Sequence, residues 1–122
     1  MRSSRRIVGD IGKLIELFAP RCQDRGTLDV LRALLGEPGR WREAHDLFGT
    51  IRDRTLAAER ANDRVRTAQY LFEEVCAQSL FNLSGAPAPF DADAPYWIVP
   101  NAFALARALG VLPEKVSEIV GA

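Results

Sequence analysis

The sequence has a single histidine and only two cysteines, which restricts the chemistry that the chain can support. His45 alone is too few imidazoles for an HExxH zinc site, and Cys22 and Cys76 form no CxxC or zinc-type cluster. We expect reduced thiols, with Cys76 in the core and Cys22 the more accessible. Phosphate-binding motifs such as GxGxxG are absent as well. The sequence therefore predicts no metal, no cofactor and no catalytic function; an enzyme with His45 as general base is the weakest alternative.

Long apolar segments and an excess of one charge are also missing. No apolar run approaches the roughly 18–20 residues that span a bilayer, and Asp10 and Glu16 argue against an N-terminal signal peptide. The 16 basic and 16 acidic residues give a net charge of zero. Nucleic-acid-binding domains usually carry net positive charge, because phosphate neutralisation supplies most of their affinity. We therefore expect a soluble, cytoplasmic protein that contacts no membrane and for which nucleic acid is the less favoured partner.

Regularly spaced apolar residues predict helices along most of the chain. The first helix should end at Pro20, and a second should run from an N-cap at Thr27 to Gly36. Strand alternation and hairpin turn signals are absent from the sequence. Its 122 residues are enough for one core. We therefore predict an all-α fold, a single-domain bundle of five or six helices over residues 1–122.

The central segment from Pro38 to Leu83 carries a nearly continuous apolar stripe at three- and four-residue spacing. The pair Asn62 and Asp63 is its one plausible break, since either residue could cap a new helix. The pattern is consistent with one long helix or with two. The part of the stripe from Phe48 to Leu83 could also serve a homodimer.

A proline-rich segment, SGAPAPFDADAPYW at residues 84–97, separates this stripe from the C-terminal part of the chain. Prolines favour extended backbone and remove amide donors, so we expect a structured surface loop here. Pro100 suits the first turn of the following helix, which should end at Gly110. Pro113 should then open a short last helix.

Acidic and aromatic residues gather around this loop and form the candidate partner-binding site. The carboxylates would form one acidic face if the loop folds back over the preceding helix, and such a face suits a basic partner. The neighbouring rings have the character of interface anchors. A solvated acidic face, and rings that plug the core, are the alternatives. The candidate residues are Glu73, Glu74, Asp91, Asp93, Tyr96 and Trp97.

An arginine-rich stripe runs along the central segment. Residues 1–66 carry 14 basic and 10 acidic residues, whereas residues 67–122 carry 2 and 6. Acidic residues interleave with the arginines, as intrahelical ion pairs require, which favours a mixed charged surface. The alternative function is a helical nucleic-acid-associated regulatory protein that uses this face. The arginines are Arg40, Arg42, Arg52, Arg54, Arg60, Arg64 and Arg66.

The motifs FEEVC at residues 72–76, NLSG at 82–85 and PFDADAPYWIVPNA at 89–102 stand within residues 70–111. This third of the chain resembles small bacterial helical proteins that include immunity proteins of contact-dependent growth inhibition systems. The resemblance implies a cytoplasmic antidote that binds its cognate toxin domain, often a nuclease, and blocks it stoichiometrically. It assigns no role to any individual residue.

Overall fold

The computed structural model describes residues 3–87 and 91–121, and they form a bundle of six α-helices. These residues contain no β-strand, so the predicted all-α fold is confirmed. None of their helices combines the length and the apolar character needed to cross a membrane. The helices are α1 (Ser4–Phe18), α2 (Gly26–Leu35), α3 (Ala44–Arg60), α4 (Arg64–Leu83), α5 (Ala94–Leu109) and α6 (Pro113–Val120), with 3₁₀ turns η1 (Ala19–Arg21) and η2 (Pro38–Glu43).

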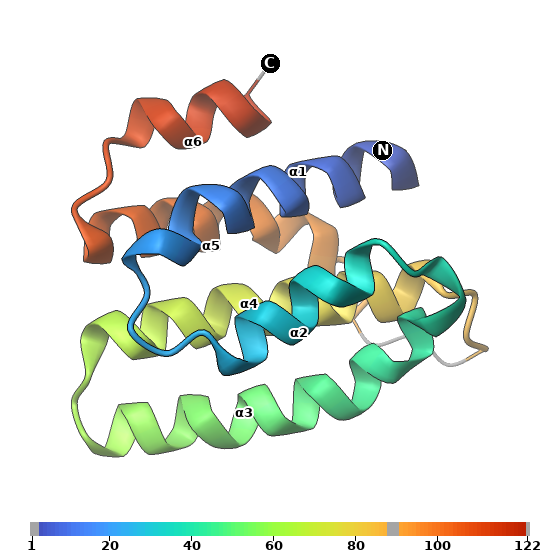
Figure 1. The fold of residues 1–122 in the computed structure, drawn as a ribbon, viewed down its shortest axis with the longest axis horizontal. Helices are drawn as coiled ribbons and strands as arrows, with labels where there is room; N and C mark the ends of the chain where they lie inside the picture. The colour runs from blue at the N-terminus through green and yellow to red at the C-terminus, as the bar shows by residue number, and fades with distance from the viewer. Residues whose placement is uncertain (1–2, 88–90, 122) are drawn as a thin grey trace.

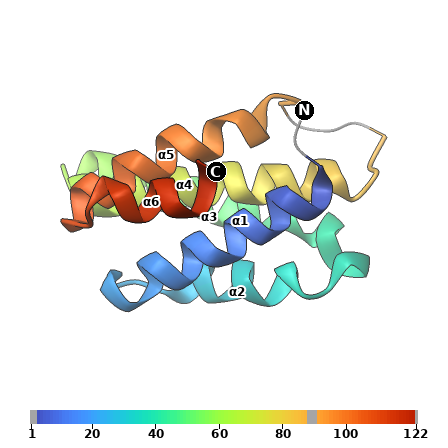
Figure 2. The same ribbon diagram turned by 90° about the horizontal axis from the view of Figure 1, so that it is seen from above.

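Helix α4 is the centre of the bundle. It packs against α3 on one side and α5 on the other, and it also contacts α1 and α2 (Figure 1). Seen from above, α1 lies between α2 and α5, and α6 packs on both α1 and α5 (Figure 2). A helix with neighbours on several sides must bury more than one stripe. The buried residues of α4 are Gln69, Tyr70, Phe72, Glu73, Glu74, Cys76, Ala77, Ser79 and Leu80.

The central segment consists of two helices, which settles the alternative left open by its pattern. Asn62 has a positive φ of 53°, a left-handed conformation that asparagine adopts more readily than most residues. Asp63 follows as the N-cap of α4, and its carboxylate accepts a hydrogen bond from the Arg66 amide at 3.0 Å. The chain therefore reverses at the predicted break, and α3 and α4 pair as a helical hairpin (Figure 1).

The start of α5 differs from the prediction. The helix begins at Ala94, so Tyr96 and Trp97 belong to its first turns, and Pro100 lies inside the helix. Proline is well tolerated in the first turn of a helix, and in α5 that position is taken by Pro95 and not by Pro100. Pro113 opens α6 as expected. Residues 88–90 of the predicted proline-rich loop lie outside the described residues.

The two cysteines are both buried, and Cys22 is the more accessible of the two, as predicted. Cys76 is fully buried as expected, whereas Cys22 retains 9% of its exposure and belongs to the core as well. Burial raises the pKa of the Cys22 thiol to about 11, and Glu73 contributes in the same direction. The Cys22 thiol therefore stays protonated at neutral pH.

Candidate functional site

Glu73 is fully buried, so it is not part of an exposed acidic face as predicted. The Thr27 hydroxyl donates to one of its carboxylate oxygens at 2.5 Å, and the Gln69 side-chain amide donates to the other at 2.7 Å. Burial raises the pKa of this carboxyl to about 7, although the two hydrogen bonds act in the opposite direction. Glu73 therefore joins α4 to α2 inside the protein.

Glu74 is also buried, with 7% of its surface exposed, and it faces α3 instead of α2. The Thr55 hydroxyl donates to its carboxylate at 2.6 Å, and Arg52 lies 3.4 Å from the other oxygen. Consecutive residues of a helix point in different directions, and on α4 both directions lead to another helix. The prediction that Glu73 and Glu74 lie on the surface is therefore wrong.

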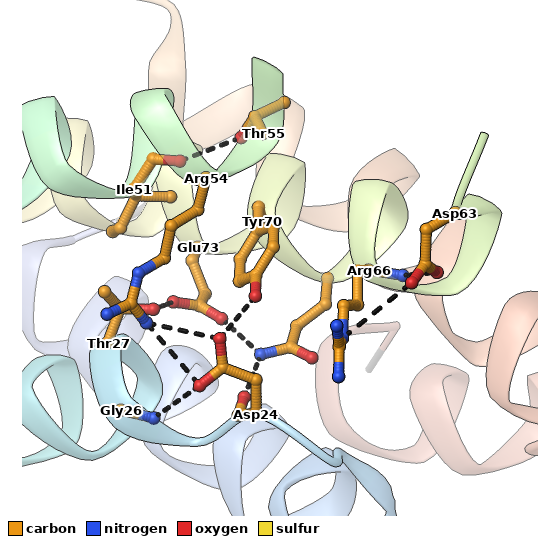
Figure 3. Close-up of polar contacts among 11 residues, drawn as sticks. Asp24, Gly26, Thr27, Ile51, Arg54, Thr55, Asp63, Arg66, Tyr70 and Glu73 are labelled. Carbon is orange, nitrogen blue, oxygen red and sulfur yellow. Dashed lines mark hydrogen bonds and ion pairs between the residues drawn. The ribbon is translucent and has the colours of Figure 1, made fainter. Parts of the chain in front are cut away.

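Asp24, in the loop between η1 and α2, is the centre of a polar network that the sequence did not reveal (Figure 3). Its carboxylate accepts hydrogen bonds from the Tyr70 hydroxyl, from the Gly26 amide at 3.1 Å and from Arg54 at 3.2 Å. The Tyr70 hydrogen bond is the main cause that holds the pKa of Asp24 below its ordinary value. Burial, together with Asp24, raises the pKa of Tyr70 to about 12.

This network links the loop between η1 and α2 to helices α3 and α4. The backbone carbonyl of Asp24 accepts from the Gln69 side chain at 2.6 Å, so Gln69 contacts both the loop and Glu73. Thr27 was expected to cap α2, but the helix begins at Gly26 and the Thr27 hydroxyl bonds to Glu73. The partners of these groups described above all lie within the protein, which is the arrangement expected of a structural joint.

The other four candidate residues lie on the surface at the start of α5. Tyr96 is 62% exposed and Trp97 52%, so the alternative that these rings plug the core is wrong. Asp91 and Asp93 are exposed as well. Asp93 is the N-cap of α5, and Trp97 follows it in the first turns of the helix. We name Asp91, Asp93, Tyr96 and Trp97 the acidic–aromatic patch.

Hydrogen bonds keep the backbone under this patch in place. The Asn82 side chain, near the end of α4, donates to the Asp91 carbonyl at 2.8 Å. The Asp93 amide donates to the Asp91 carboxylate at 2.8 Å, and the Tyr96 amide donates to the Asp93 carbonyl at 2.9 Å. The patch is thus an exposed surface on an ordered turn and helix.

The arginine-rich stripe does not form one free surface. Arg40 pairs with Glu37 and Glu43 close by in the sequence, as the mixed charged surface predicted. Arg52 and Arg54 instead pair with acids of other elements, Glu74 of α4 and Asp24 of the α1–α2 loop. His45 is an exposed helix residue, as expected, whose ring lies 5.3 Å from that of Phe81. Within the described residues, no group of three or more His, Cys, Asp or Glu side chains could hold a metal ion.

Within residues 3–87 and 91–121 the structure is an all-α bundle in which the acidic–aromatic patch is exposed. No family model, curated protein or solved structure matches the chain.

Proposed function

We propose that the protein is an immunity-type inhibitor, which binds a cognate toxin domain one to one in the cytoplasm and neutralises it. The observation that supports this proposal is the acidic–aromatic patch, where two large rings are more than half exposed beside two carboxylates. Exposed tryptophan and tyrosine are the side chains most enriched at the energetic centres of protein interfaces. The same residues lie in the segment whose motifs resemble immunity proteins.

The charge of the patch indicates the kind of partner. Exposed carboxylates attract a basic surface and speed its association, while the rings supply the apolar area that is buried in the complex. A nuclease toxin offers such a surface, because its substrate channel must contact phosphate groups. Asp91 and Asp93 would then occupy the place of substrate phosphates, and inhibition would follow from competition.

The decisive experiment titrates the protein against any toxin domain that the neighbouring genes encode, by calorimetry and with a nuclease assay, and the absence of such a domain would count against the proposal. We expect a one-to-one complex in which Trp97→Ala weakens affinity by about 30-fold, the ratio that corresponds to a hot-spot loss of about 2 kcal/mol. The double change Asp91→Lys/Asp93→Lys should slow association and restore nuclease activity.

A matched control reverses two exposed acids of α3, which lies across α4 from α5 (Figure 1). The variant Asp53→Lys/Glu59→Lys has the same net charge as the patch variant, and both residues are exposed. It should bind the toxin as the wild type does. Equal affinity of the patch variants and this control would overturn the proposal.

A further inference from the structure

A second surface lies at the end of the bundle away from the acidic–aromatic patch. The loop between α1 and α2 and the turn between α3 and α4 come together at this end, whereas the segment before α5 lies at the other (Figure 1). The segment from η1 to α2, the second half of α3 and the start of α4 carry six arginines. We name this surface the arginine end: Arg21, Arg25, Arg54, Arg60, Arg64 and Arg66.

Two adjoining hollows show that the two loops meet there. One, of about 220 Å³, is lined by Asp24, Arg54 and Arg66 and by alanines that include Ala57. The other, of about 290 Å³, contains Arg21 and again Arg66. Arg66 therefore stands between side chains from the α1–α2 loop and from α3. The spacing of residues in the sequence does not predict that Arg21 and Arg66 line the same hollow.

The arginines at this end outnumber the acids among them by three. Three acids lie among the six arginines: Asp24, Glu59 and Asp63. Asp24 is engaged by Tyr70, Gly26 and Arg54, and Asp63 lies 3.8 Å from Arg66, beyond hydrogen-bond distance. Arg25, Arg60 and Arg64 are exposed and form no ion pair within residues 3–87 and 91–121.

The residues around these arginines indicate whether the partner is an acidic protein or a nucleic acid. A protein interface needs apolar or aromatic anchors, and the only large exposed apolar side chain on this surface, among the described residues, is Val65. Contact with a nucleic-acid backbone needs only charge and donors, and the planar guanidinium fork fits phosphate oxygens. The composition of this surface therefore favours phosphate over an acidic protein.

We infer that the arginine end binds the phosphate backbone of nucleic acid without reading its sequence. This goes beyond the proposed inhibition of a toxin and uses different residues. Three arginines that neutralise phosphates give a salt slope of roughly −3 on duplex DNA, so affinity should fall about 20-fold between 50 and 150 mM salt. With a net charge of zero on the whole chain, binding is weak and confined to low salt.

The test is fluorescence anisotropy with a labelled 20-base-pair DNA duplex and the full-length protein at 50 mM salt. We expect the triple variant Arg25→Gln/Arg60→Gln/Arg64→Gln to lose at least 10-fold in affinity and to have a flatter salt slope. The matched control, Arg32→Gln/Arg42→Gln/Arg107→Gln, removes the same charge from exposed arginines elsewhere and should change affinity by less than threefold. A duplex of scrambled sequence should bind equally.

Three results would overturn the inference: no binding of the duplex at 50 mM salt, equal losses in the two triple variants, or tighter binding of a polyglutamate peptide than of the duplex. The patch variant Asp91→Lys/Asp93→Lys should retain DNA binding. Failure of the toxin experiment and failure of this one are therefore distinguishable.

Discussion

The middle of α4 and the start of α5 both carry two carboxylates near aromatic rings, and the structure treats them in opposite ways. On α4, Glu73 and Glu74 accept hydroxyl donors from α2 and α3, Glu73 also accepts from Gln69 of α4 itself, and both are almost completely buried. At α5, Asp91 and Asp93 remain exposed beside two exposed rings. Buried carboxylates with internal donors stabilise the arrangement of helices, whereas exposed ones are free to meet a partner.

The comparison implies that changes inside the network should alter stability and that changes in the patch should leave stability intact. The network includes the loop residue Asp24, whose contacts reach 30 to 46 positions along the chain. The patch rests on local hydrogen bonds and on one contact from Asn82. The following predictions test this separation.

Among changes in the polar network and the patch, the largest effect on stability is expected for Asp24→Ala. The change removes the acceptor of the Tyr70 hydroxyl, the Gly26 amide and Arg54, and the Tyr70 side chain is almost completely buried. Hydrogen bonds to a charged group contribute about 1.5–3 kcal/mol each, and a buried donor without a partner adds to the loss. We expect the free energy of unfolding, measured in urea by circular dichroism, to fall by about 3 kcal/mol.

A double-mutant cycle identifies the cause of this loss. Tyr70→Phe removes the hydroxyl but keeps the ring, so Asp24→Ala should cost less in that background, by about 1 kcal/mol or more. Additive losses would show that the Tyr70 hydroxyl and Asp24 do not act together.

The next effect concerns pH and Glu73. Its pKa is raised from 4.5 to about 7 in the folded protein, so the folded state binds the proton more tightly than the unfolded state. The stability contributed by the protonated group is fully present below pH 4.5 and is lost as the pH rises through 7. A shift of this size corresponds to a change on the order of 3 kcal/mol. Urea unfolding between pH 4.5 and pH 8 measures it.

Glu73→Gln is the matched variant, because the amide has the shape of the protonated acid and does not titrate. Its unfolding free energy should vary less with pH than that of the wild type, so that it gains relative to the wild type at pH 8. Titration of Asp24 does not contribute in this pH range. Because its pKa is lowered from 3.8 in the folded protein, the stability that its carboxylate contributes is lost only at pH values below the range measured. Parallel curves for the two proteins would contradict the assignment.

The sequence predicted the helices well, because their signal is the local spacing of apolar residues. The same local reasoning identified the reversal at Asn62 and Asp63, where short polar side chains adopt the turn and cap conformations. The same reasoning was wrong about Pro100, which it placed at the start of a helix because proline favours that position. In the structure Pro95 lies in the first turn of α5 and Pro100 lies inside the helix.

The polar interior could not be predicted in the same way. Glu73 lies 46 positions from Thr27, and Glu74 lies 19 from Thr55. Nothing local distinguishes a glutamate that meets such a partner from one that meets water. The arginine end has the same origin, since Arg21 and Arg66 approach each other only after the helices have packed.

The smallest change in stability is expected for Tyr96→Ala and Trp97→Ala. Both rings are more than half exposed, and substitutions at such positions usually change the free energy of unfolding by no more than about 0.5 kcal/mol. Phe72→Ala is the contrasting control, because that ring is fully buried against Phe18 and its loss should cost about 3–5 kcal/mol. Urea unfolding of the three variants measures the difference. If Trp97→Ala cost as much as Phe72→Ala, the ring would be a packing element, and weaker toxin binding by that variant would no longer be evidence for an interface at α5.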